Sequence, residues 1–281
     1  MNGSDRRDRL ARGGRCLREL AGRLFPPSCA LCGSCVERGR APACDACWSR
    51  LPRAVPPRCD RCGAPAPRFA DRVEACAECI DWPAGLPRVR APYLMRGGAA
   101  ELVRALKYRG WTALAVPMGE AMAAAARSVA GDDPRPTGAP RLVPVPLAPP
   151  RQRRRGFNQA GLLARHLARE LGWSVTAALR RGTRGRRQAR LGGASRRENV
   201  RGLFRARPPG ETSGPAAAGR PAAVVVDDVV TTASTAAACA EALRRAGWRP
   251  LGAVAFARTV APGPEAGEGR NDGERHTSRD G

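Results

Sequence analysis

Residues 224–235 read VVVDDVVTTAST, and this stretch decides the fold. Its run of three valines predicts a short buried strand, and the adjacent acids Asp227 and Asp228 stand where we expect that strand to end. A hydroxyl-rich turn follows, and residues 236–246 read as a helix. A strand–loop–helix unit leaves backbone N–H groups unpaired at the start of its helix, and the helix dipole adds positive charge there. The stretch therefore predicts an anion site at the turn.

The two halves of this stretch together predict a ligand with hydroxyls at one end and a phosphate at the other. Asp227 and Asp228 would repel a phosphate but accept hydrogen bonds from sugar hydroxyls. The turn residues are Thr231, Thr232, Ala233, Ser234 and Thr235. A ribose 5-phosphate meets both requirements, and Mg²⁺ is an expected companion because carboxylates and phosphates share it readily. The alternative is a capped α/β crossover, in which Thr and Ser only satisfy the helix start.

The stretch resembles the phosphoribosyl-diphosphate (PRPP) signature of type I phosphoribosyltransferases. The shared pattern is a hydrophobic strand, two acids, two apolar residues and a small hydroxyl-rich loop. The resemblance implies that Asp227 and Asp228 hold the ribose 2′- and 3′-hydroxyls and that residues 231–235 cradle the 5′-phosphate. Purine-using members often carry Asp where Thr231 stands, so a purine substrate is less expected. Ala233 occupies a position that is often Gly, and Ala tolerates positive φ poorly, so we expect a tighter or less avid loop.

A second strand–loop–helix unit precedes the first in the chain. Residues 141–147 form a short strand broken by prolines, and a helix runs to about Leu171. The loop between them is basic and includes Arg151, Arg154 and Arg155. Because guanidinium forks match phosphate oxygens, we expect the pyrophosphate half of PRPP at this loop. A solvated run of charge is the alternative, since Arg is abundant throughout the chain.

Four CxxC pairs occupy residues 26–82, a segment rich in Pro and Gly and poor in aliphatic residues. Each pair supplies two thiolates to one side of a tetrahedral metal, and two pairs close a four-cysteine site. Sequential pairing gives two ribbons, Cys29/Cys32/Cys44/Cys47 and Cys59/Cys62/Cys76/Cys79. Crossed pairing stays open, and Cys35 could replace a ligand of the first site. We expect structural zinc, because four thiolates leave no open coordination position, and we expect metal binding to stabilise the segment.

Charge and composition limit the classes of function. The net charge is +24, and Lys107 is the only lysine among 49 basic residues, so the basicity comes almost wholly from Arg. A basic surface attracts phosphates and nucleic acid, although an aromatic content of 4% is low for a protein that stacks many bases. No apolar run approaches the roughly 20 residues that span a bilayer, and we read no secretory signal. We expect a cytoplasmic chain with reduced thiols, which disfavours disulfides.

The chain divides into four expected parts. Residues 1–25 predict an amphipathic helix that packs on a neighbour, with membrane attachment as the alternative. The double zinc ribbon spans 26–82, an α/β domain spans 85–259, and the tail over 260–281 is expected to be disordered. The elements expected in the α/β domain include strands at 89–95 and 251–257, helices at 99–108 and 111–129, and a basic segment at 180–204 that is either a loop over the ligand or an exposed helix.

The combination of parts resembles the ComF family over roughly residues 20–258. The resemblance rests on the paired cysteines, LKYRG at 106–110, VPVPL and RRRGFNQA within 143–160, RQARLGGASRRENVRGLF at 187–204, and the stretch at 224–235. ComF proteins join a double zinc ribbon to a phosphoribosyltransferase-like domain and are associated with natural transformation and incoming single-stranded DNA. The resemblance implies a type I phosphoribosyltransferase-like α/β fold, with a mostly parallel sheet and helices on both faces.

Three functions are compatible with these patterns. The first is a phosphoribosyltransferase that binds PRPP and transfers its phosphoribosyl group to an acceptor that the sequence does not identify. The second is a non-enzymatic module for single-stranded DNA binding and uptake on the same scaffold. The third is a PRPP-sensing regulator without turnover. No residue identifies itself as a general base, and the oligomeric state is left open.

Overall fold

The structure is a computed structural model that describes residues 27–37, 42–67, 73–80, 82, 85–131, 138–182, 202–213 and 220–260. The helix expected at 1–25 lies outside these ranges, and so does the tail expected over 260–281 except for its first residue. The basic segment expected at 180–204 is described only at its two ends.

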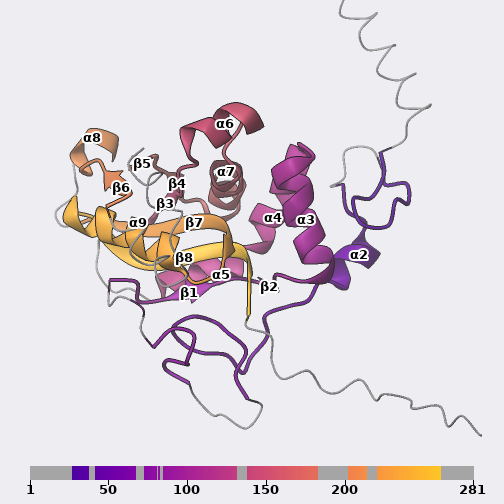
Figure 1. Cartoon of the computed structure of the whole chain (residues 1–281), viewed down its shortest axis with the longest axis horizontal. Helices are drawn as coiled ribbons and strands as arrows, with labels where there is room; N and C mark the ends of the chain where they lie inside the picture. The colour runs from indigo at the N-terminus through magenta and orange to yellow at the C-terminus, as the bar shows by residue number, and fades with distance from the viewer. Residues whose placement is uncertain are drawn as a thin grey trace, which may run out of the picture.

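A parallel sheet of six strands forms the centre of the fold (Figure 1). The order across it is β1-β8-β7-β3-β4, and β2 pairs with β8 further along the same edge. Its strands are β1 (Val89–Arg90), β2 (Tyr93–Leu94), β3 (Arg141–Pro144), β4 (Ser174–Val175), β7 (Ala222–Val230) and β8 (Arg249–Arg258). Every pairing in this sheet is parallel, which confirms the predicted mostly parallel α/β sheet.

Helices connect the strands, as parallel pairing requires. Within the described residues, the helices between strands are α3 (Gly97–Tyr108), α4 (Ala115–Ala121), α5 (Ala123–Ala130), α6 (Pro149–Arg155), α7 (Gln159–Leu171), α8 (Gly210–Ser213) and α9 (Ser234–Arg245), with a 3₁₀ turn η1 at Thr112–Leu114. A further helix, α2 (Asp45–Ser49), precedes β1. A separate antiparallel pair joins β5 (Leu179–Arg181) to β6 (Phe204–Ala206).

The core lies on both faces of the sheet because successive strand residues point to opposite sides. Val224 and Val226 pack with buried residues of α3, α4, α5 and α7 on one face. Ala223 and Val225 pack on the other face with α9, the β5–β6 pair and the second group of cysteines. The helices therefore cover both faces, as the sequence predicts.

Several predicted boundaries differ from the structure. The central strand runs through Val230, so the two acids lie inside β7 and not after it, because β8 continues the pairing as far as Arg258. The expected strand at 89–95 is split into β1 and β2 around Pro92, which has no N–H to donate. The helix expected at 111–129 is divided into η1, α4 and α5. The basic segment after β3 forms α6, whose prolines stand at the first helical positions, where a missing N–H costs nothing.

The two cysteine-rich segments dock on different parts of the α/β domain. In the first, Trp48 packs its ring edge-on against Tyr93 and also contacts Phe256, and Figure 1 shows α2, which belongs to this segment, beside α3. In the second, the carbonyl oxygen of Arg61 accepts a hydrogen bond of 2.8 Å from the N–H of Val89. The second segment lies beyond β1 in Figure 1. Both segments are thus attached to the sheet.

Candidate functional site

The turn between β7 and α9 keeps its helix start free of side-chain caps. Ala233 is the N-cap residue of α9, and its methyl side chain cannot accept a hydrogen bond from the amides of the first turn. Thr232 and Ser234 instead pair their hydroxyls with each other at 2.9 Å. This arrangement disfavours the alternative in which Thr and Ser serve only as caps, and within the described residues it leaves the N-terminal amides of a 12-residue helix without a side-chain cap, as an anion site requires.

Ala233 adopts the left-handed backbone conformation that Gly adopts easily and Ala tolerates poorly. Its φ is 54°, and among the residues that the structure describes it is the only non-glycine with positive φ. Its methyl group is buried in the core beneath α9. Such a conformation costs an L-residue about 1–2 kcal/mol, so the surrounding packing must hold the turn in this shape.

Strand register places the second predicted loop beside the first. Pro144 of β3 stands opposite Val226 of β7 in a parallel pair, and the N–H of Val145 donates to the carbonyl oxygen of Val226 at 2.9 Å. The chain that leaves β3 therefore emerges at the edge of the sheet where Asp227 and Asp228 stand. Ligands of open α/β sheets bind beyond this edge.

The two neighbouring acids have different surroundings. Asp228 is almost fully buried, and its Oδ2 contacts the ammonium of Lys107, which stands in the last turn of α3. Apart from this ammonium, Asp228 Oδ2 has no polar partner within the described part of the chain, so Lys107 is what compensates its charge. Asp227 is partly exposed, and its Oδ1 accepts a hydrogen bond of 2.9 Å from the N–H of Asp228. The acid that remains available to a ligand is therefore Asp227.

The protein around the Asp227 carboxyl disfavours its charge. Burial raises the pKa of Asp227 well above its ordinary value, and the negative charge of Asp228 raises it further, whereas Lys107 lowers it. Asp227 also interacts electrostatically with Arg181 of β5 and with the buried thiol of Cys239 on α9. Carboxyls with strongly shifted pKa values gather at functional sites, which marks this edge of the sheet as a candidate site.

The basic residues of α6 are divided between packing and solvent. Arg155 donates to Gln159 Oε1 at 2.6 Å and lies 5.3 Å from the ring centroid of Tyr108, the exposed residue next to Lys107. Burial lowers the pKa of Arg181, and the positive charge of Arg151, an exposed residue, lowers it further. Arg154 is exposed as well. Arg155 thus lies near Tyr108, the neighbour of Lys107, and Arg151 lies near Arg181, which interacts with Asp227. Among the described residues, no such contact relates Arg154 to the acid pair.

Two residues of this site were not predicted from sequence. Lys107 had a signal, since it is the only lysine in a chain that otherwise uses Arg. Arg181 had none, because its approach to Asp227 depends on the long-range pairing of β5 with β6. Both bring a cation to the acid pair from an element distant in sequence.

The eight predicted cysteines gather into two groups of four that fit structural zinc. The groups are Cys29/Cys32/Cys44/Cys47 and Cys59/Cys62/Cys76/Cys79, so the pairing is sequential, and Cys35 belongs to neither. The Sγ atoms of Cys62 and Cys76 are 3.5 Å apart, and those of Cys32 and Cys44 are 3.8 Å apart. Four sulfurs at about 2.3 Å from a tetrahedral zinc are separated by about 3.8 Å, so both groups have the right size for Zn²⁺.

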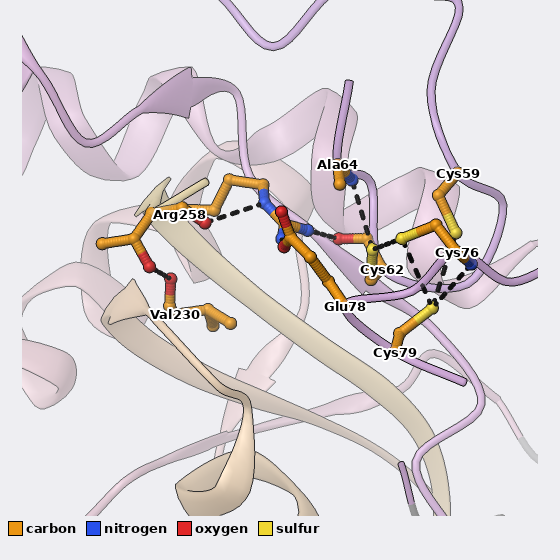
Figure 2. A network of polar contacts seen from close by, with 9 residues as sticks. Cys59, Cys62, Ala64, Cys76, Glu78, Cys79, Val230 and Arg258 are labelled. Atoms are coloured by element: carbon orange, nitrogen blue, oxygen red, sulfur yellow. Dashed lines mark hydrogen bonds and ion pairs between the residues drawn. The ribbon is translucent and has the colours of Figure 1, made fainter. Parts of the chain in front are cut away.

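Figure 2 shows how the second group is tied to the end of β8. Arg258, which is fully buried, donates to the carbonyl oxygen of Cys62 and to the carboxylate of Glu78. Thr259 directly follows Arg258, and its N–H donates to the carbonyl oxygen of Val230 at 2.9 Å. Val230 is the last residue of β7 before the turn that leads to α9. Arg258 thus connects a cysteine group to the strand ends that carry the candidate site.

The described residues at this edge of the sheet form no cage for Mg²⁺ by themselves, and the predicted Mg²⁺ shared between a carboxylate and the ligand's phosphate stays a prediction. Mg²⁺ requires several oxygen ligands in octahedral geometry and usually keeps some water. Asp228 Oδ2 is buried and already contacts an ammonium. Within the described ranges, no carboxylates or histidines form a group of three that could hold an ion.

The comparison with protein families adds one finding. Residues 20–80 match the family model of the double zinc ribbon domain, which covers both cysteine groups. None of the curated proteins compared with the chain matches it. The helices within the described ranges are all too short or too polar to cross a membrane. The structure and this match together show an α/β protein with an N-terminal double zinc ribbon.

Proposed function

We propose that the chain binds PRPP, or another ribose 5-phosphate ligand, at the carboxyl edge of β7 and β3. The observation that carries this proposal is the pairing of a helix start on α9 that its N-cap side chain does not cap with a partly exposed acidic residue, Asp227, on the strand that precedes it. The 5′-phosphate would accept hydrogen bonds from the amides and hydroxyls of residues 231–235, and Asp227 would accept them from a ribose hydroxyl. Asp228 contributes mainly through its negative charge and its ion pair with Lys107.

The reaction that this arrangement supports is phosphoribosyl transfer. A nucleophile forms a bond to C1 of the ribose while the bond from C1 to the pyrophosphate oxygen breaks, and the bonding electrons leave with pyrophosphate. Arg151 and Arg155 lie on the side of the acid pair, where they would stabilise the departing negative charge. The fold and the ComF resemblance support this reaction class, whereas the acceptor is left open.

The zinc ribbon has a structural role in the proposal. Its four thiolates per site leave no coordination position for a substrate. Reduced thiols require a reducing compartment, which is why the proposal includes a cytoplasmic location.

Single-stranded DNA binding is the second candidate function, and exposed arginines favour it. Arg151, Arg153 and Arg154 expose their side chains along α6. Contacts between arginine and phosphate would give an affinity that falls steeply with salt. Fluorescence anisotropy with a labelled oligo(dT) between 50 and 200 mM salt, roughly the range over which such contacts lose most of their affinity, tests this candidate. A flat salt profile rejects it.

The experiment for the main proposal is isothermal titration calorimetry with PRPP, repeated on Asp227→Asn. We expect saturable heat for the parent protein and affinity reduced roughly tenfold or more for the variant, because a ribose hydroxyl loses a charged acceptor. Glu241→Gln is the matched control, since Glu241 is an exposed acid that pairs with arginines on α9. Equal affinity in parent and Asp227→Asn contradicts the assignment of the ribose. A pyrophosphate-release assay over bases and amines then separates an enzyme from a binding module.

A further inference from the structure

The ion pair between Lys107 and Asp228 has no evident role in packing. The Lys107 side chain is 21% exposed and that of Asp228 is 5% exposed, so both groups give up most of their hydration. Removing charged groups from water costs several kcal/mol per ion, and well-packed apolar residues often serve stability better. Arg244 and Glu241 show the other common arrangement, an exposed pair on one helix face. The buried pair therefore requires a reason other than stability.

The position of Lys107 relates it to the candidate site. Lys107 ends α3 on one face of the sheet, while Asp228 lies near the end of the central strand. Its neighbour Tyr108 contacts Arg155 of α6, so the end of α3 and the basic helix lie against each other. The ammonium thus approaches the acid pair from the side on which we place the pyrophosphate half of the ligand.

We infer that Lys107 is a positioning residue that serves as the resident cation of the acid pair, in place of a divalent metal, and so prepares Asp227 to accept the ribose hydroxyls. This inference rests on the proposed function. Without the ammonium, the charges of two neighbouring carboxylates would repel each other uncompensated, and Asp228 Oδ2 would be a buried charge with no partner among the described residues. With it, the charge of Asp228 is compensated inside the protein. The carboxylate end of the site then needs no metal ion of its own.

The charges around Asp227 fix the direction of the expected effect. Asp228 of β7 raises the pKa of Asp227 and Lys107 of α3 lowers it. Among the described residues, Arg181 of β5 and the thiol of Cys239 on α9 also interact with it. Removing the ammonium should therefore move the pKa of Asp227 further upward. Ribose hydroxyls donate stronger hydrogen bonds to a carboxylate than to a neutral carboxyl group. As the pH is lowered, ligand affinity should therefore begin to fall at a higher pH in the variant than in the parent.

The test measures binding of ribose 5-phosphate by the full chain in the presence of EDTA, for the parent, Lys107→Met and Lys107→Arg. We expect the parent to bind equally well with EDTA and with Mg²⁺. Lys107→Met should bind roughly tenfold more weakly, and Lys107→Arg should stay within roughly threefold of the parent. Arg104→Met is the matched control, because Arg104 lies on the same helix in an exposed pair with Glu101.

A pH series and a double variant separate a positioning role from a structural one. In Lys107→Met, the loss of ligand affinity on acidification should occur at a higher pH than in the parent. In a chain that already carries Asp228→Asn, adding Lys107→Met should change the affinity little. The pKa of Asp227, measured by carbon NMR without ligand, should rise in Lys107→Met, and Lys107→Arg supplies the comparison if the Met variant does not fold.

The outcomes distinguish this inference from the proposed function. The role of Lys107 is overturned, and the proposed function is kept, if two results occur together. In Lys107→Met, the affinity for ribose 5-phosphate and the pKa of Asp227 are unchanged, while Asp227→Asn loses binding. Parent binding that disappears in EDTA also overturns it, because a metal would then be required. Failure of the parent to bind ribose 5-phosphate under any condition overturns the proposed function itself.

Discussion

The guanidinium of Arg258, at the end of β8, donates to the carbonyl oxygen of Cys62 inside the second four-cysteine group (Figure 2). The same side chain is fully buried and also pairs with Glu78. A single residue of the central sheet therefore holds a peptide group of the ribbon in place. The stability of the second ribbon and that of the sheet should be linked.

We predict that Arg258→Met destabilises the chain by about 2–3 kcal/mol, because it removes charged hydrogen bonds from a buried carbonyl and a half-buried carboxylate. Chemical denaturation followed by tryptophan fluorescence measures this change. Arg244→Met is the control and should leave the midpoint unchanged, since Arg244 lies in an exposed pair. A midpoint for Arg258→Met equal to that of the parent would show that the contact carries no stability.

Zinc content tests the sequential pairing of the cysteines. The purified chain should contain about two zinc ions, and Cys62→Ser/Cys76→Ser should contain about one, because the first group remains complete. This double variant should also melt at a lower temperature, since Arg258 links its ribbon to the sheet. Cys35→Ser is the control and should keep both ions, because Cys35 lies outside both groups. Loss of zinc in Cys35→Ser would mean that the pairing is wrong.

The two neighbouring acids should have opposite effects on stability. Burial and Asp228 raise the pKa of Asp227, so its carboxyl favours folding when protonated and loses that contribution as pH rises from about 4, its unfolded value, through its higher folded value. Asp227→Asn should therefore raise the thermal midpoint at pH 7.5, and the gain should vanish near pH 3.

Asp228→Asn should instead lower the midpoint at neutral pH, by an amount equivalent to about 1–3 kcal/mol, because it leaves Lys107 largely buried without its partner. Thermal melts across pH measure both variants. A loss of stability in both at pH 7.5 would contradict the separate environments that the structure gives the two carboxyls.

The left-handed turn residue provides a test of loop shape. Ala233→Val should cost about 2 kcal/mol or more, because a β-branched side chain fits poorly at a φ of 54° and in a buried position. Ala233→Gly should stay within about 1 kcal/mol of the parent, since relief of the backbone offsets the lost methyl group. Equal stability in the Val and Gly variants would show that the turn is not held in this conformation.

The features that short stretches of sequence encode could be predicted from the sequence. The CxxC spacing fixes which sulfurs lie together within a few residues, and the valine run before Asp227 fixes the central strand. Sequence reasoning failed where partners are distant along the chain. Lys107 meets Asp228, and Arg258 meets Cys62, only because the parallel sheet brings α3, β7, β8 and the ribbon to one edge, and no periodicity in the sequence encodes those pairings.

The length of β7 shows the same limit. The acids are polar, so the sequence places them after the strand, but the partner strand β8 continues to pair as far as Arg258 and keeps Asp227 and Asp228 extended. Tertiary pairing here overrides the local preference of Asp for turns. In the proposed site, the two acids are therefore held on a strand and not on a loop.

The most direct test of the central claim is a titration of PRPP into the ¹⁵N-labelled chain, followed through backbone amide signals. We predict saturable shifts at residues 231–235, where the backbone amides would meet the 5′-phosphate, and at Asp227 and Asp228, with the amides of α2 unchanged. Saturation with no shift at residues 227–235, or shifts confined to the zinc ribbon, would contradict it.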